Sequence, residues 1–136
     1  MTSEVLMTRK DVRRLQQMIQ DLRASGRQHT QFDALERELA RARALSIREV
    51  PEDVVTMNSR VRLRDLATDE RDVYTVVYPR RADWAVGRIP VLAPLATALL
   101  GVREGAVIRH GGPDSARTLE VERVLYQPEA AGDYHL

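Results

Sequence analysis

Cysteine is absent from the 136-residue chain, and aromatic residues make up only 4% of it. Without cysteine there is no thiolate nucleophile, no disulfide and no Cys-based zinc site, which suits the reducing cytoplasm. No apolar run approaches the roughly 18 to 20 residues of a membrane span, and residues 1–10 lack the apolar core of a secretory signal. We therefore expect a cytoplasmic protein with no membrane association.

The net charge is also small: 21 Lys and Arg residues against 20 Asp and Glu residues give +1. A chain so close to neutral has little electrostatic reason to bind free DNA, and no specific free-DNA binding is expected. Its 43% hydrophobic and 30% charged residues lie near the averages of soluble globular proteins. The chain should therefore fold, and its length allows one ordinary domain or a small domain with an extension.

The first third of the chain carries two apolar stripes at helical spacing, namely Val12, Leu15, Ile19 and Leu22, then Phe32, Leu35, Leu39 and Ala42. Thr8 and Asp11 resemble a capping box at the start of the first helix, and Ser25 and Gly26 interrupt the pattern. Residues 1–48 are therefore predicted to form a short antiparallel helical hairpin, a coiled-coil finger with arms of about 25 Å. Because its stripes are thin, the hairpin should lean on the rest of the chain.

After Pro51 the apolar pattern changes to the period of strands. Strands are predicted over residues 54–66, 71–78, 89–92, 107–110 and 118–126. A short helix at 95–100 should begin after Pro94 and end at Gly101. Residues 49–136 are thus expected to form a second domain of the α+β class, in which one short helix covers a small antiparallel sheet.

Catalytic patterns are missing as well. The histidines lie far apart and lack a His or Glu partner one helical turn away: His29, His110 and His135. Residues 101–105 do not match a phosphate-binding loop. Glu120 and Glu122 alternate on one strand and can hold a divalent cation, although solvated strand charges are far commoner. We expect no catalytic residues, no metal, no cofactor and no enzyme activity.

Basic residues alternate along the first predicted strand and recur after the second: Arg60, Arg62, Arg64, Arg80 and Arg81. Such a face can attract phosphate or an acidic protein surface, but the polar outer side of a half-buried sheet has the same pattern and is commoner. The apolar helical stripes also fit either a monomer or a pairing with a second chain. The sequence alone is compatible with both interpretations.

Three segments resemble a known family. Residues 51–63, PEDVVTMNSRVRL, and residues 93–101, APLATALLG, are similar to the C-terminal domain of the Gre transcript-cleavage factors. The tail at 125–136, LYQPEAAGDYHL, narrows the resemblance to one branch of that family. The resemblance covers residues 45–136 strongly and the hairpin in general pattern, and it implies an FKBP-like fold for the C-terminal domain.

In Gre factors the globular domain docks at the rim of the RNA polymerase secondary channel, and acidic residues at the finger tip hold a catalytic magnesium ion. The family's docking loop maps here to Leu92, Ala93, Pro94 and Leu95. The tip, by contrast, has no carboxylate and contains Ser25, Gly26, Arg27 and His29. The resemblance therefore implies a non-catalytic transcription regulator that binds RNA polymerase and competes with Gre factors without stimulating transcript cleavage.

The branch to which the tail points also implies an influence on nucleoside diphosphate kinase levels. The alternative is direct protein–protein regulation of that kinase or of another enzyme. Peptidyl-prolyl isomerase activity is a third interpretation, taken from the FKBP-like fold alone. One Trp, one Phe and four Tyr are too few to suggest an aromatic proline pocket.

Overall fold

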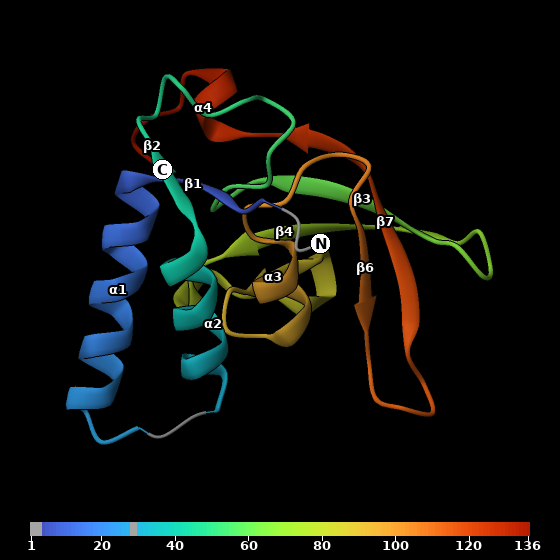
Figure 1. Cartoon of the computed structure of the whole chain (residues 1–136), viewed down its shortest axis with the longest axis horizontal. Coiled ribbons are helices and arrows are strands. Elements are labelled where there is room, and N and C mark those ends of the chain that lie inside the picture. Colours follow the sequence, from blue (N-terminus) through green and yellow to red (C-terminus); the bar gives the residue numbers. More distant parts are fainter. Residues whose placement is uncertain (1–3, 28–29) are drawn as a thin grey trace.

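The computed structural model describes residues 4–27 and 30–136. Two helices and two short strands make up its N-terminal part: β1 Leu6–Thr8, α1 Arg9–Ala24, α2 Thr30–Arg41 and β2 Arg43–Leu45. The helices form the predicted antiparallel hairpin, and β1 and β2 pair in parallel beside its base (Figure 1). At 1.5 Å per residue α1 is about 24 Å long and α2 only about 18 Å, so the second arm is shorter than expected. Neither short strand was predicted.

Both ends of α1 follow from local chemistry. The Thr8 hydroxyl accepts a hydrogen bond from the Asp11 N–H at 3.0 Å, which confirms half of the predicted capping box. At the other end Gly26 adopts a positive φ of 85°. The N–H groups of Gly26 and Arg27 return to carbonyls of the last helical turn, which is the pattern of a Schellman cap.

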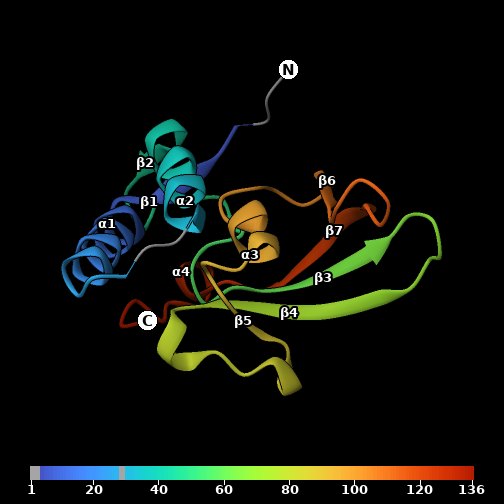
Figure 2. The same ribbon diagram turned by 90° about the horizontal axis from the view of Figure 1, so that it is seen from below.

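The rest of the chain builds a five-stranded sheet in the order β5-β4-β3-β7-β6. Its strands are β3 Arg60–Asp65, β4 Arg71–Val77, β5 Arg88–Pro90, β6 Val107–His110 and β7 Arg117–Tyr126. The helices are α3 Pro94–Leu99 and α4 Pro128–Ala131, and two 3₁₀ turns are η1 Pro79–Arg81 and η2 Trp84–Val86. The α+β class is confirmed, and Figure 2 shows α3 between the hairpin and the sheet.

Three details of the sheet domain differ from the prediction. The sheet is not wholly antiparallel, because residues 78–87 loop back and β5 runs parallel to β4. A second short helix, α4, follows β7; with four residues it is too short to give a periodic signal. Residues 54–59 are not strand: Asn58 has a φ of 67°, and the Ser59 hydroxyl accepts from the Thr56 N–H at 2.9 Å. The apolar residues there are buried, and Val54 forms only an isolated bridge with Arg103.

One hydrophobic core joins the hairpin to the sheet. The buried stripes of α1 and α2 lie in the same cluster as residues from the sheet and α3. The hairpin contributes Leu15, Ile19 and Leu35, the sheet Val61 and Val76, and α3 Leu99. The hairpin therefore leans on the rest of the chain, as its thin stripes predict. The division at residues 48/49 remains a prediction. Within the described ranges, no helix is long and apolar enough to cross a membrane.

Gly101 ends α3 and contacts the start of the hairpin. It has a φ of +84°, accepts a hydrogen bond from the Leu6 N–H at 2.9 Å and donates one to the Val55 carbonyl at 2.8 Å. A Cβ atom here would lie 2.4 Å from Cγ1 of Val5. The position thus requires glycine both for its backbone conformation and for its close contact with the N-terminal segment.

The Gly101→Ala substitution should lower the free energy of unfolding by about 3 kcal/mol, because it combines backbone strain with a clash in the core. Gly105→Ala is the matched control, since Gly105 has a φ of +89° but open space around its Cα. The control should lose only about 1 kcal/mol. Urea denaturation measures both; equal losses would show that the contact with Val5 is unimportant.

Candidate docking surface

The loop between β5 and α3 is held in one conformation by its own hydrogen bonds. The Val91 N–H donates to the Val77 carbonyl at 2.8 Å, and the Ala93 N–H donates to the Pro90 carbonyl at 2.8 Å. The Thr97 hydroxyl, from α3, donates to the Val91 carbonyl at 2.7 Å. These bonds tie the loop to the sheet on one side and to α3 on the other, which makes it a preformed surface.

The four residues predicted to dock follow one another through this loop into α3. Pro94 is exposed at the first position of the helix, and Leu92 and Ala93 are half-buried. Leu95 is only 7% exposed and belongs to the core. The surface that a partner can touch is therefore made by Leu92, Ala93 and Pro94, while Leu95 holds the helix in place beneath them.

The hairpin reaches this loop through the first turn of α2. The Gln31 side-chain amide donates to the Leu92 carbonyl at 3.1 Å. Phe32, the next residue, is 3% exposed and anchors the same turn in the core. Because α2 begins near the finger tip, the tip end of the hairpin lies beside the loop (Figure 1). Nothing in the sequence identified Gln31, since its partner lies 61 residues away.

At the finger tip the structure describes Ser25, Gly26 and Arg27, whereas His29 lies outside the described residues. The Ser25 hydroxyl donates to the Leu22 carbonyl at 2.7 Å, which secures the last turn of α1. Arg27 is exposed. The described part of the tip therefore offers a hydroxyl and a guanidinium.

The acidic side chains at the start of α2 are occupied by Arg23. Its guanidinium lies 2.6 Å from Oε1 of Glu36 and 3.2 Å from Oδ1 of Asp33. It also lies over the ring of Phe32, 5.6 Å from the ring centre. The hydrogen bond and charge of Arg23 hold the pKa of the Glu36 carboxyl below its usual value. Among the described residues, no three His, Asp or Glu side chains are grouped so that they can hold a metal ion.

A buried carboxylate lies where the hairpin meets the sheet domain. Asp11 is 2% exposed, and its Oδ2 accepts a hydrogen bond from the Met57 N–H at 3.2 Å. Burial, and then the nearby charge of Glu129, raise the pKa of Asp11 to about 6. Glu129, on α4, accepts from the Thr56 hydroxyl at 2.6 Å. The capping box predicted for Asp11 is thus only half formed, because its carboxylate bonds to another part of the chain.

Comparison with known proteins accounts for both parts of the chain. The family model "Transcription elongation factor, GreA/GreB, C-term" matches residues 50–126, and the model "Rnk N-terminus" matches residues 4–45. The "Regulator of nucleoside diphosphate kinase" of Escherichia coli K12 is 50% identical over 105 residues, which cover 76% of this chain and 77% of that protein. The chain belongs to the Rnk branch of the GreA/GreB family. The resemblance read from its tail is thereby confirmed.

Other members of the family support the fold. A "Prokaryotic transcription elongation factor GreA/GreB from Nitrosomonas europaea" superposes with a TM-score of 0.77 at 32% identity, covering 92% of this chain and all of that one. The "Transcription elongation factor GreA" of Bartonella tribocorum is 33% identical over 95 residues, which cover 70% of this chain and 60% of that protein. These relatives are named as transcription factors, and the mixed α+β architecture is shared with them.

In this member of the family the arginine-rich face of the sheet is paired with acid. Glu122 lies 2.6 Å from the Arg62 guanidinium and 3.1 Å from that of Arg71, and Glu120 lies 3.8 Å from Arg64. The interpretation as a polar outer face is therefore correct for these strand residues. Arginines lie against both carboxylates of the alternative divalent-cation site, Glu120 and Glu122, and oppose the binding of a cation there.

The Asp11 carboxyl should make stability depend on pH. Its pKa in the folded protein, about 6, exceeds its ordinary value of 3.8, so the folded state holds the proton more tightly between these pH values. Stability therefore falls as pH rises from 4 to 6, and two pKa units correspond to about 3 kcal/mol. At neutral pH the ionised carboxylate is a cost to the fold.

The Asp11→Asn variant should be more stable than the natural chain by about 2 kcal/mol at pH 7, because the amide oxygen still accepts from Met57 without a buried charge. It should also flatten the decline in stability between pH 4 and pH 7, measured by urea denaturation. Asp21→Asn, which removes an exposed carboxylate from the same helix, should leave the Asp11-dependent decline in place. An unchanged slope in Asp11→Asn would contradict the assignment.

Proposed function

We propose that this protein is a non-catalytic transcription regulator that binds RNA polymerase near its secondary channel and competes there with Gre factors. The observation that carries the proposal is a family docking loop combined with a finger tip that has no carboxylate in its sequence, residues 24–30. The loop supplies the reason to expect binding. The tip supplies the reason to expect no transcript cleavage.

The case for docking rests on a rigid and accessible loop. Hydrogen bonds to the sheet and to α3 fix residues 91–93, so binding requires little ordering of the chain. Pro94 is exposed, and Leu92 and Ala93 are partly so. An apolar contact made by only three residues suits a weak or transient regulatory complex. The neighbouring first turn of α2 enlarges this contact surface.

The case against cleavage rests on charge. Magnesium is a hard cation that prefers oxygen ligands, and carboxylates are its usual protein partners. Arg27 would repel a cation at the tip, and the nearest acids of α2, Asp33 and Glu36, are paired with Arg23. The protein should therefore occupy the polymerase site without supplying the carboxylates that hold the catalytic magnesium ion.

Altered nucleoside diphosphate kinase levels would follow from this activity as a transcriptional effect. The name of the Escherichia coli relative, "Regulator of nucleoside diphosphate kinase", also fits a direct contact with the kinase. Mixing the purified kinase with this protein in the absence of polymerase separates the two. A changed kinase activity in that mixture would favour direct regulation.

Competition for purified RNA polymerase tests the docking surface. Increasing amounts of this protein should displace fluorescently labelled GreA, and Pro94→Asp should weaken displacement about tenfold, a loss of roughly 1.4 kcal/mol. Aspartate is tolerated in the first turn of a helix, so the fold should survive. Val107→Asp is the matched control, because Val107 is 54% exposed on the far edge of the sheet. Equal weakening by both variants would refute docking through this loop.

Backtracked transcription complexes test the absence of catalysis. Saturating amounts of the natural protein should leave the rate of transcript cleavage at the level of polymerase alone, and should reduce cleavage stimulated by GreA. Strong cleavage with this protein alone would overturn the non-catalytic assignment. Failure to affect GreA would instead argue against a shared binding site.

A further inference from the structure

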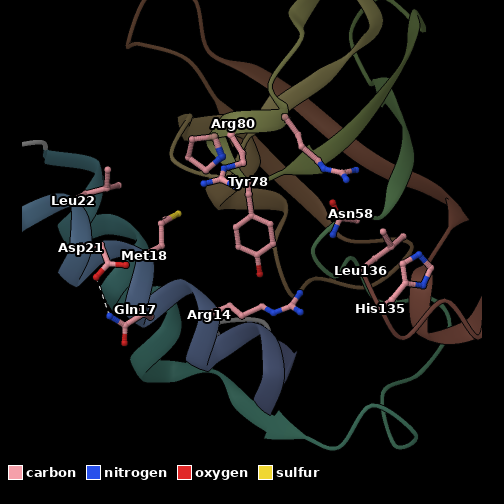
Figure 3. Close-up of a pocket in the computed structure, with 12 residues that line it drawn as sticks. Arg14, Gln17, Met18, Asp21, Leu22, Asn58, Tyr78, Arg80, His135 and Leu136 are labelled. Atoms are coloured by element: carbon pink, nitrogen blue, oxygen red, sulfur yellow. Dashed lines mark hydrogen bonds between the residues drawn. The ribbon is translucent and has the colours of Figure 1, made fainter.

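A cleft of about 640 Å³ opens between α1, the 3₁₀ turn η1 and the C-terminal segment (Figure 3). Side chains from all three elements line it, including Arg14, Met18, Tyr78, Arg80, Arg81 and His135. Its volume falls in the range of small-molecule sites, about 300 to 1,000 Å³. Neither the docking surface nor the finger tip uses these residues.

The cleft has one apolar wall. Met18 and Leu22, one turn apart on α1, are half-buried and face it. Pro79 and the ring of Tyr78 add apolar surface on the side of the cleft opposite α1. Figure 3 shows the ring projecting between α1 and Asn58. A flat apolar group placed here would contact thioether, aliphatic and aromatic carbon.

Arginines dominate the rim of the cleft, whose lining also includes the Asp21 carboxylate. Arg80 and Arg81 are consecutive residues of η1, which is held by the hydrogen bond from the Arg81 N–H to the Tyr78 carbonyl at 2.9 Å. In the described part of the chain neither side chain forms an ion pair, unlike the arginines of the sheet face. Arg14 and His135 add basic groups from α1 and the C-terminal segment.

Polar groups complete the lining. The Tyr78 hydroxyl is buried and points toward the guanidinium of Arg14 (Figure 3). Burial, and then the charge of Asp11, raise the pKa of Tyr78 to about 12, so the group stays protonated as a donor. On α1 the Gln17 amide donates to the Asp21 carboxylate at 2.9 Å, which leaves acceptor oxygens at the cleft edge.

We propose that this cleft binds a nucleoside polyphosphate, with its phosphates between Arg80, Arg81 and Arg14 and its base against Met18 and Leu22. Guanidinium groups pair bidentately with phosphate oxygens, and several of them at one rim suit a polyanion better than a single carboxylate. The adjoining apolar wall suits a planar base, and the acceptors of Asp21 suit its exocyclic amino groups. This inference is independent of polymerase binding.

Isothermal titration calorimetry of the full chain tests the proposal, with ATP, GTP, adenosine and pyrophosphate as the probes. ATP or GTP should bind at least about tenfold more tightly than either adenosine or pyrophosphate, because only the whole nucleotide contacts both the apolar wall and the arginines of the rim. Replacing both cations, Arg80→Ala with Arg81→Ala, should weaken nucleotide binding at least about tenfold. Arg109→Ala is the matched control, an exposed arginine on β6 without an ion pair in the described chain.

A second variant tests the apolar wall. Met18→Ala should weaken ATP or GTP binding several-fold and leave pyrophosphate binding unchanged, and circular dichroism will check that each variant is folded. Absence of nucleotide binding at millimolar concentration would overturn the proposal. So would equal affinity for ATP and pyrophosphate, which would show a simple anion site, or tighter binding of a short single-stranded RNA, which would show a nucleic-acid surface.

Discussion

The attachment of the hairpin to the sheet domain is the constraint on which the other features depend. Gly101 links the two by bonding to Leu6 on one side and Val55 on the other, and the buried Asp11 carboxylate receives the Met57 N–H. A buried ionised carboxylate is costly at neutral pH, so hydrophobic burial along both helices must outweigh it. This attachment determines where the finger lies and forms one wall of the cleft.

Because the hairpin is attached in this way, it does not act as a freely projecting finger. Phe32 lies near the tip yet is buried in the common core, and Gln31 bonds to the loop that we propose docks on polymerase. The first turn of α2 and the loop are therefore held together. If the protein docks as we propose, an α2 of only about 18 Å suits covering a site better than reaching deep into a channel.

The sequence predicted what local periodicity encodes. Both hairpin helices, the strand pair after Arg60 and the helix begun by Pro94 follow from apolar spacing and from caps within a few residues. The parallel β4–β5 pairing, the contact of Gln31 and the cleft arise from contacts between distant segments, which leave no local signal. The contact of Asp11 left a partial signal in the sequence. Asp11 lies one turn before Leu15 on the buried stripe, where a polar residue needs a partner.

The contrast between two sets of arginines shows why composition alone understates local charge. On the sheet, Arg62 and Arg71 converge on Glu122, so part of their charge is offset across neighbouring strands. In η1, Arg80 and Arg81 have no acid within ion-pair distance in the described chain. The net charge of the chain, only +1, does not reveal this local positive charge. Charges at a concave, partly apolar site are screened less by water than those on a flat face. The unpaired set therefore exerts the stronger local field on an approaching anion.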